Sequence, residues 1–165
     1  MVRRIGLALG LMAALSGCQR SEGPTEIAGK IFIFNYRLST AVYEIALKKT
    51  GEIPEGSTVT AEYENPAGGK PLVTTMKIFS FWQKIALESP PLRCVVKDHP
   101  YKVTITINGP DKAELQRIET SVISSLDQSI LAAKPLVKGP AYDKNPDVFK
   151  PDGTADYSPD KDCGT

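Results

Sequence analysis

Three cysteines and a single histidine are the residue types here best suited to covalent or metal chemistry. Cys94 could act as a nucleophile only with His99 as its base, and His99 lies beside Pro100 in a turn. Cys94, His99 and Cys163 also offer three metal-ligand candidates, but they lack CxxC or HxH spacing and a fourth ligand. We therefore expect neither a catalytic thiol nor a metal site.

Carboxylates are the other candidates for chemistry. Glu62 and Glu64 alternate with apolar residues, which is typical of a solvated strand face. Four aspartates near the C-terminus lack the residue order and the closing Glu of an EF-hand loop: Asp152, Asp156, Asp160 and Asp162. GxSxG, SxxK, GxGxxG and Walker motifs are absent. We expect no enzyme and no cofactor, although a glycosidase-type carboxylate pair stays open because sequence does not give its spacing in the fold.

Cys18 follows a segment that is first basic and then apolar. Two arginines precede an 11-residue apolar run over residues 5–15, which is shorter than the roughly 20 residues that span a bilayer. The run fits the apolar region of a secretory signal peptide. It ends in LSGC at residues 15–18, and residues 1–18 resemble the lipobox signal peptide of bacterial lipoproteins.

This resemblance implies a cellular location for the protein. In that family the cysteine thiol receives a diacylglyceryl group, the chain is cut before it, and the new N-terminus is acylated. Residues 1–17 would then be the signal peptide, and Cys18 would anchor the protein to a membrane through lipid. Gln19, rather than Asp, follows Cys18, which favours the outer membrane. An ordinary signal peptide with a chance cysteine, or a cytoplasmic protein with an apolar N-terminus, are the alternatives.

Lipidation of Cys18 leaves two cysteines, Cys94 and Cys163, in an oxidising compartment. An even pair there predicts a disulfide. The bond would close a loop of about 70 residues and stabilise the fold by about 4 kcal/mol, or less if the tail is disordered. Two free or intermolecular thiols are the alternative.

The stretch FSFW at residues 79–82 gathers Phe79, Phe81 and Trp82, with Lys77 and Lys84 nearby. An exposed aromatic cluster of this kind would mark a binding patch. The alternative is that the rings cap the edge of the core.

Charge and length restrict the class of protein. Without residues 1–17, which hold two arginines and no acid, Lys+Arg falls from 20 to 18 against 19 Asp+Glu. The mature charge of about −1 offers no basic excess, so we expect no nucleic-acid partner. The remaining 148 residues suffice for one domain with a core.

The elements that would position these residues are strands. Seven runs alternate apolar with polar residues and are rich in β-branched side chains: 31–38, 41–49, 57–64, 71–78, 83–89, 101–108 and 114–125. Turn sequences separate them, including NPAGG and NGPD. The pattern predicts an all-β fold, an immunoglobulin-like antiparallel β-sandwich of about seven strands over residues 29–134.

Tyr101 opens the sixth run after the polar turn KDHP. This arrangement resembles the tyrosine corner of immunoglobulin-like and fibronectin type III domains, which implies a hydroxyl bonded to the chain upstream. The Cys…Trp…Cys pattern of antibody domains is absent, and Trp82 lies between two runs. An ordinary half-buried strand tyrosine is the alternative.

Three further segments complete the chain. Residues 18–28 are polar and predict a tether. In residues 125–134, either a two-turn helix capped by Ser125 with Gln128 as partner or an irregular segment fits the sequence. Residues 135–165 are rich in proline and aspartate, so we expect an extended or disordered tail.

These features favour a lipid-anchored envelope protein with a non-catalytic binding or assembly role on the periplasmic side of the outer membrane. The expected partners are the membrane, through Cys18, and an envelope protein. A small-ligand or glycan-binding module is the alternative, and a hydrolytic enzyme has less support. An unpaired edge strand near FSFW would favour docking, whereas a pocket with convergent polar groups would favour a ligand.

Replacing Cys18, the expected site of lipidation, directly tests the predicted membrane location. We expect Cys18→Ala to abolish incorporation of radiolabelled fatty acid and to release the protein from membranes, because both acylation steps start at that residue. Metabolic labelling and membrane fractionation are the measurements. Unchanged fractionation of the variant would refute the lipoprotein interpretation.

Overall fold

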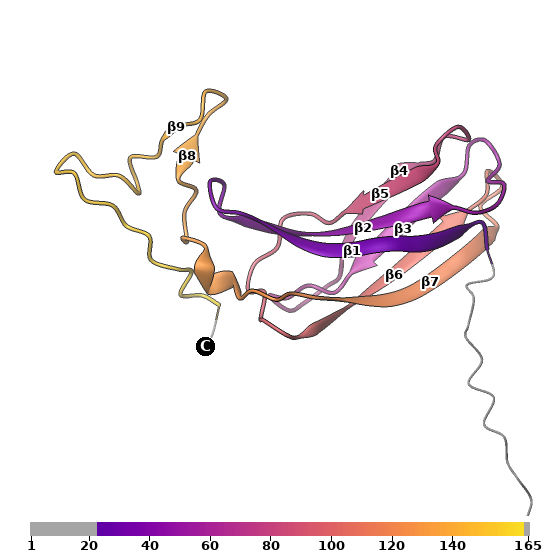
Figure 1. The fold of residues 1–165 in the computed structure, drawn as a ribbon, viewed down its shortest axis with the longest axis horizontal. Helices are drawn as coiled ribbons and strands as arrows, with labels where there is room; N and C mark the ends of the chain where they lie inside the picture. Colours follow the sequence, from indigo (N-terminus) through magenta and orange to yellow (C-terminus); the bar gives the residue numbers. More distant parts are fainter. Residues whose placement is uncertain (1–22, 164–165) are drawn as a thin grey trace, which may run out of the picture.

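The computed structural model describes residues 23–163 as two antiparallel β-sheets packed face to face, with a tail at one end (Figure 1). Seven strands form the two sheets: β1 (Thr25–Asn35), β2 (Thr40–Lys49), β3 (Thr58–Tyr63), β4 (Leu72–Lys77), β5 (Lys84–Glu88), β6 (Pro100–Asn108) and β7 (Glu114–Ile123). The predicted all-β sandwich of about seven strands is confirmed.

The strand order links the sheets at several points. One sheet has the order β1-β2-β5 and the other has the order β4-β3-β6-β7. The neighbours β2 and β5, and β3 and β6, are distant in the sequence, so the chain passes repeatedly from one sheet to the other. Such crossings connect the two sheets into one unit and are compatible with an immunoglobulin-like body.

The core lies between the sheets, where alternate side chains of the inner strands are buried. The members from β2, β3, β5 and β6 are Tyr43, Ile45, Leu47, Val59, Ala61, Tyr63, Ile85, Leu87, Tyr101, Val103, Ile105 and Ile107. These are the faces that the period of two predicts. Each buried aliphatic or aromatic side chain of this size contributes about 1.5–3 kcal/mol.

Four aromatic rings pack together at the tail-side half of this core. The centroid of Tyr43 lies 4.5 Å from Phe32, 5.6 Å from Tyr63 and 5.9 Å from Tyr101. Burial raises the pKa of all three tyrosine hydroxyls above the ordinary value. The three hydroxyls therefore stay neutral, and two of them bond to backbone groups. The first is Tyr43, whose hydroxyl donates to the Glu64 carbonyl over 3.2 Å.

Tyr101 makes the second of these bonds in the manner that the sequence predicts. Its hydroxyl oxygen accepts the Val96 N–H over 2.8 Å, so it ties the start of β6 to the loop that precedes it. The residue itself is buried, and the alternative of an ordinary half-buried tyrosine is wrong. The bond has the geometry of a tyrosine corner.

Two segments differ from the boundaries expected from local pattern. β1 begins at Thr25, upstream of Gly29 and inside the segment expected as tether, because Thr25 pairs with Lys49 and its backbone N–H donates to Gln116 Oε1 over 3.0 Å. Residues 125–134 contain a single 3₁₀ turn, η1 (Gln128–Ile130), whose cap is Asp127 rather than Ser125. Within the described residues, no helix has the length and apolar character needed to cross a membrane.

The tail follows a defined path of turns, although the sequence suggested an extended or disordered chain. It includes two short paired strands, β8 (Val137–Lys138) and β9 (Asp143–Lys144). Asn145 and Val148 are buried at its centre, and the Asn145 amide donates to the Pro135 carbonyl over 2.6 Å. The tail thus builds a small local core of its own beside the sandwich.

The tyrosine corner can be tested by removing one oxygen. Tyr101→Phe keeps the buried ring but leaves the Val96 N–H without its acceptor, so we expect a loss of about 1 kcal/mol in the free energy of unfolding. Urea denaturation followed by circular dichroism measures it. Tyr157→Phe, in the exposed part of the tail, is the control, and an equal effect of the two substitutions would contradict a role for the corner.

Candidate functional site

Strand pairing places the loops at two opposite ends of the sandwich (Figure 1). The end where β1 begins is called the proximal end here and carries loops 50–57, 78–83 and 109–113. The registers that bring these loops together are Thr25↔Lys49, Lys48↔Lys84, Thr58↔Lys77 and Thr58↔Asn108. The opposite end, called the tail end, carries loops 36–39 and 89–99 together with the tail.

The predicted aromatic patch is at the proximal end, in the loop 78–83 that joins β4 to β5. The Phe79 centroid lies 5.7 Å from Phe81 and 5.1 Å from Trp82, so the structure brings the three rings together. Phe79 is 42% exposed and Phe81 is 74% exposed. Trp82 is half-buried and packs against the core. The cluster therefore combines a core-capping ring with two rings that face solvent.

Neighbouring loops hold this aromatic loop in place. Ile78 is buried, and its N–H donates to the Ser57 carbonyl over 2.9 Å. The Lys49 amino group donates to the Ser80 carbonyl over 2.6 Å, and the Ser80 N–H donates to Glu55 over 3.4 Å. The loop is thus fixed at its base, while the ring of Phe81 is presented outward.

A disulfide joins Cys94 to Cys163 at the tail end, with a Cα–Cα distance of 4.9 Å. This confirms the pairing predicted from the cysteine count. Because the Cys94 sulfur is bonded to another sulfur, it offers no thiolate to a substrate or a metal. Cys18 lies outside the described residues.

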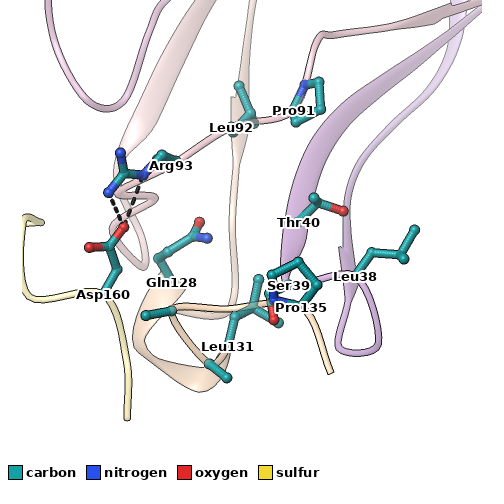
Figure 2. Close-up of a pocket in the computed structure, with 12 residues that line it drawn as sticks. Leu38, Ser39, Thr40, Pro91, Leu92, Arg93, Gln128, Leu131, Pro135 and Asp160 are labelled. Atoms are coloured by element: carbon teal, nitrogen blue, oxygen red, sulfur yellow. Dashed lines mark hydrogen bonds and ion pairs between the residues drawn. The ribbon is translucent and has the colours of Figure 1, made fainter. Parts of the chain in front are cut away.

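Beside this disulfide the tail and the sandwich enclose a hollow of about 280 Å³ (Figure 2). Arg93 and Asp160 stand on one side of it as an ion pair, with the Arg93 Nε 2.9 Å from the carboxylate. Hydrogen bonding from Arg93 lowers the pKa of Asp160. Leucine and proline side chains form most of the other walls: Leu38, Leu92, Leu131, Pro91 and Pro135.

Gln128 lies between these two sides of the hollow (Figure 2). It is the first residue of η1, and its N–H donates to the Val95 carbonyl over 2.7 Å. Its side-chain Oε1 is buried and accepts no hydrogen bond from the described part of the chain. A buried acceptor without a donor is costly.

Sequence reasoning missed Arg93, Asp160 and Gln128 as neighbours. A signal was available for the first two, since Arg93 precedes Cys94 and Asp160 lies close before Cys163. Once these cysteines are paired, their oppositely charged neighbours must lie close together. Gln128 carries no such signal, because its place depends on the path of the chain after β7.

The other candidates do not converge on one site. His99 packs on Tyr101 with 4.6 Å between centroids, and its Nε2 lies 3.9 Å from Glu64 Oε1. Glu64 also accepts the Lys102 N–H over 2.8 Å, while Glu62 lies on the exposed face of β3. Across residues 23–163 no group of three or more His, Cys, Asp or Glu side chains has the arrangement of a metal site.

Of the four tail aspartates, Asp152 and Asp156 each accept hydrogen bonds within their own turn, whereas Asp160 and Asp162 both pair with Arg93. Asp152 accepts the Thr154 N–H over 2.9 Å, and Asp156 accepts the Ser158 N–H over 3.0 Å. Hydrogen bonds lower the pKa of both carboxyls, chiefly from the Thr154 backbone for Asp152 and from the Ser158 side chain, then its backbone, for Asp156. Their place in local turns accounts for the clustering of aspartate in the sequence without a shared ion.

Comparison with known proteins adds no relative: no protein-family model matches the chain, and no curated protein matches it significantly.

The disulfide gives a quantitative test of how the tail end is held. Replacing Cys94 and Cys163 by Ser together should lower the free energy of unfolding by about 2–4 kcal/mol, because the long closed loop no longer restricts the unfolded chain. Urea denaturation measures the change, and added reductant should affect the parent protein but not the double variant. Alkylation of both thiols in the unreduced parent protein would contradict the bond.

Proposed function

We propose that this chain is a lipid-anchored protein on the periplasmic side of the outer membrane, where it docks to an envelope protein and catalyses no reaction. Two independent features support this location. Residues 15–18 have the LSGC sequence of a lipobox. The Cys94–Cys163 disulfide fits an oxidising compartment outside the cytoplasm.

We further assign the body to the immunoglobulin-like or fibronectin type III-like class. The three-plus-four strand order and the Tyr101–Val96 bond support this assignment. Domains of this architecture present loops at both ends and strands at the sheet edges, and many of them work as binding or spacing modules.

The observation that carries the docking role is the unpaired edge formed by β4. β4 and β5 are the outer strands of their sheets, and the aromatic loop joins them. The other two outer strands, β1 and β7, brace each other, because Gln116 bonds to Thr25 and Lys30 bonds to Thr120. β4 and β5 share one bond of this kind among the described contacts, from the Thr74 hydroxyl to the Glu88 carbonyl over 3.1 Å. An outer strand offers its free backbone groups to a strand from a partner.

The chemistry of β4 suits such an addition. Val73 is 53% exposed on its outer face, and Thr75 beside it bonds only to Thr60 of the neighbouring strand among the described contacts. β-Branched residues favour extended pairing. No proline occurs within β4 to block a ladder of hydrogen bonds.

A small-ligand or glycan-binding role is the second candidate. The hollow beside the disulfide favours it, since its lining combines apolar side chains with the polar residues Gln128, Arg93 and Asp160. Arg93 and Asp160 already neutralise each other as an ion pair, so they give this alternative less support. A hydrolytic enzyme has the least support, because Glu64 is engaged by the Lys102 N–H.

Site-specific photo-crosslinking in cells tests the docking edge. A benzophenone amino acid at Val73 should form an adduct with one envelope protein, whereas the same reporter at Ile31 should not. Ile31 is a matched control because it is 57% exposed on β1, the edge braced by β7. Val73→Lys should then reduce the adduct formed from a reporter at Thr75. Equal adducts from Val73 and Ile31, or none from Val73, would reject docking through β4.

A further inference from the structure

The ring of Phe81 is the most exposed large hydrophobic side chain among residues 23–163, at 74%. The loop beneath it is held by buried Ile78 and half-buried Trp82, so this exposure belongs to an ordered loop. A fixed, solvent-facing aromatic cluster marks a contact with a protein or a membrane. Its place in the fold distinguishes these two partners.

The aromatic loop lies beside the point where the chain joins the sandwich. The Pro24 carbonyl accepts the N–H of Thr50 over 2.8 Å, and the preceding residue, Lys49, reaches the Ser80 carbonyl with its amino group. Two hydrogen bonds and one peptide unit therefore connect the start of the domain to the loop. Whatever holds the N-terminus holds the aromatic rings close to the same object.

Chain length sets how far that object can be. Residues 19–22 lie between Cys18 and Gly23. A fully extended chain covers at most about 3.6 Å per residue, so Gly23 lies within about 18 Å of a lipidated Cys18. A tether this short keeps the proximal end of the sandwich near the bilayer surface, within reach of the lipid headgroups.

Charge around the loop fits an interfacial position. Lys77 and Lys84 flank the loop and are exposed, and long lysine side chains can keep their amino groups among headgroups while the rings insert. The loop 78–83 itself has no acidic residue. Acids on the neighbouring loops (Glu52, Glu55 and Asp111) offset the lysines, so insertion of the rings, more than net charge, would supply the binding.

From this geometry we propose that the exposed rings of Phe79 and Phe81 insert into the surface of the bilayer that carries the lipid anchor, with half-buried Trp82 behind them at the interface. The inference rests on the proposed anchor at Cys18 and adds an orientation to it. The sandwich stands on the membrane by its proximal end, and the disulfide and the hollow face away. Trp at such a depth matches the preference of this residue for membrane interfaces.

The chain contains a single tryptophan, Trp82, which reports on this loop alone. Lipidated mature protein, beginning at Cys18, is reconstituted into vesicles of phosphatidylethanolamine and phosphatidylglycerol, with or without brominated acyl chains. We expect brominated lipid to quench the Trp82 emission and its maximum to lie to the blue of that of the protein in detergent-free buffer. Phe81→Ser should reduce the quenching.

Tyr142→Ser is the matched control, because Tyr142 is 54% exposed in the tail at the other end of the sandwich. It should leave the quenching unchanged. Because Trp82 is half-buried, a second form with Trp82→Phe and Phe81→Trp moves the reporter to the most exposed ring and should be quenched more strongly. Urea denaturation verifies that each variant is folded.

The possible outcomes separate the anchor from the insertion. If mass spectrometry finds lipid on Cys18 but neither reporter is quenched, the insertion is wrong and the anchor stands. If a reporter is shielded only when envelope proteins are added, the patch serves a protein partner and the insertion is wrong. If Cys18 carries no lipid, the anchor fails; quenching of the unlipidated chain by concentrated vesicles would then keep the insertion, and no quenching would reject both.

Discussion

The fold depends on one constraint, the removal of alternate side chains from water between two sheets. The inner faces of β2, β3, β5 and β6 meet in this layer, while their backbone groups are paired along the strands. Tyr101 meets both demands at once, since its ring is buried and its hydroxyl takes up the Val96 N–H. The loops and the tail are attached to the ends of this layer, where they can carry function with little effect on its packing.

The strands could be predicted from the sequence because alternation is a local property of the chain. Residues such as Val103, Ile105 and Ile107 show their buried face with no knowledge of their partners. The start of β1 could not be predicted in this way, because Thr25 is held by Gln116 from the far end of the domain. Asp127 takes the place of the expected cap at Ser125, because its carboxylate accepts the Ser129 N–H at the start of η1.

The same distinction between local pattern and long-range contacts applies to the candidate sites. The composition of FSFW indicates an aromatic patch, but its position beside Pro24 follows from strand pairing and the bond between Lys49 and Ser80. The hollow near Arg93 could not be predicted from the sequence, because its walls come from loops, η1 and the tail. The pairing of Cys94 with Cys163 was the one long-range contact that residue counting alone could suggest.

That disulfide also makes a covalent ring of everything between its two cysteines, including β6, β7 and the tail. A protease that cuts one exposed turn of the tail, such as that at Gly153, opens the ring without releasing a fragment. The nicked molecule gains one water from the cleaved peptide bond and loses no residue until a second cut or a reductant acts. The tail end of the sandwich, opposite the start of β1, thus stays attached after a first cut.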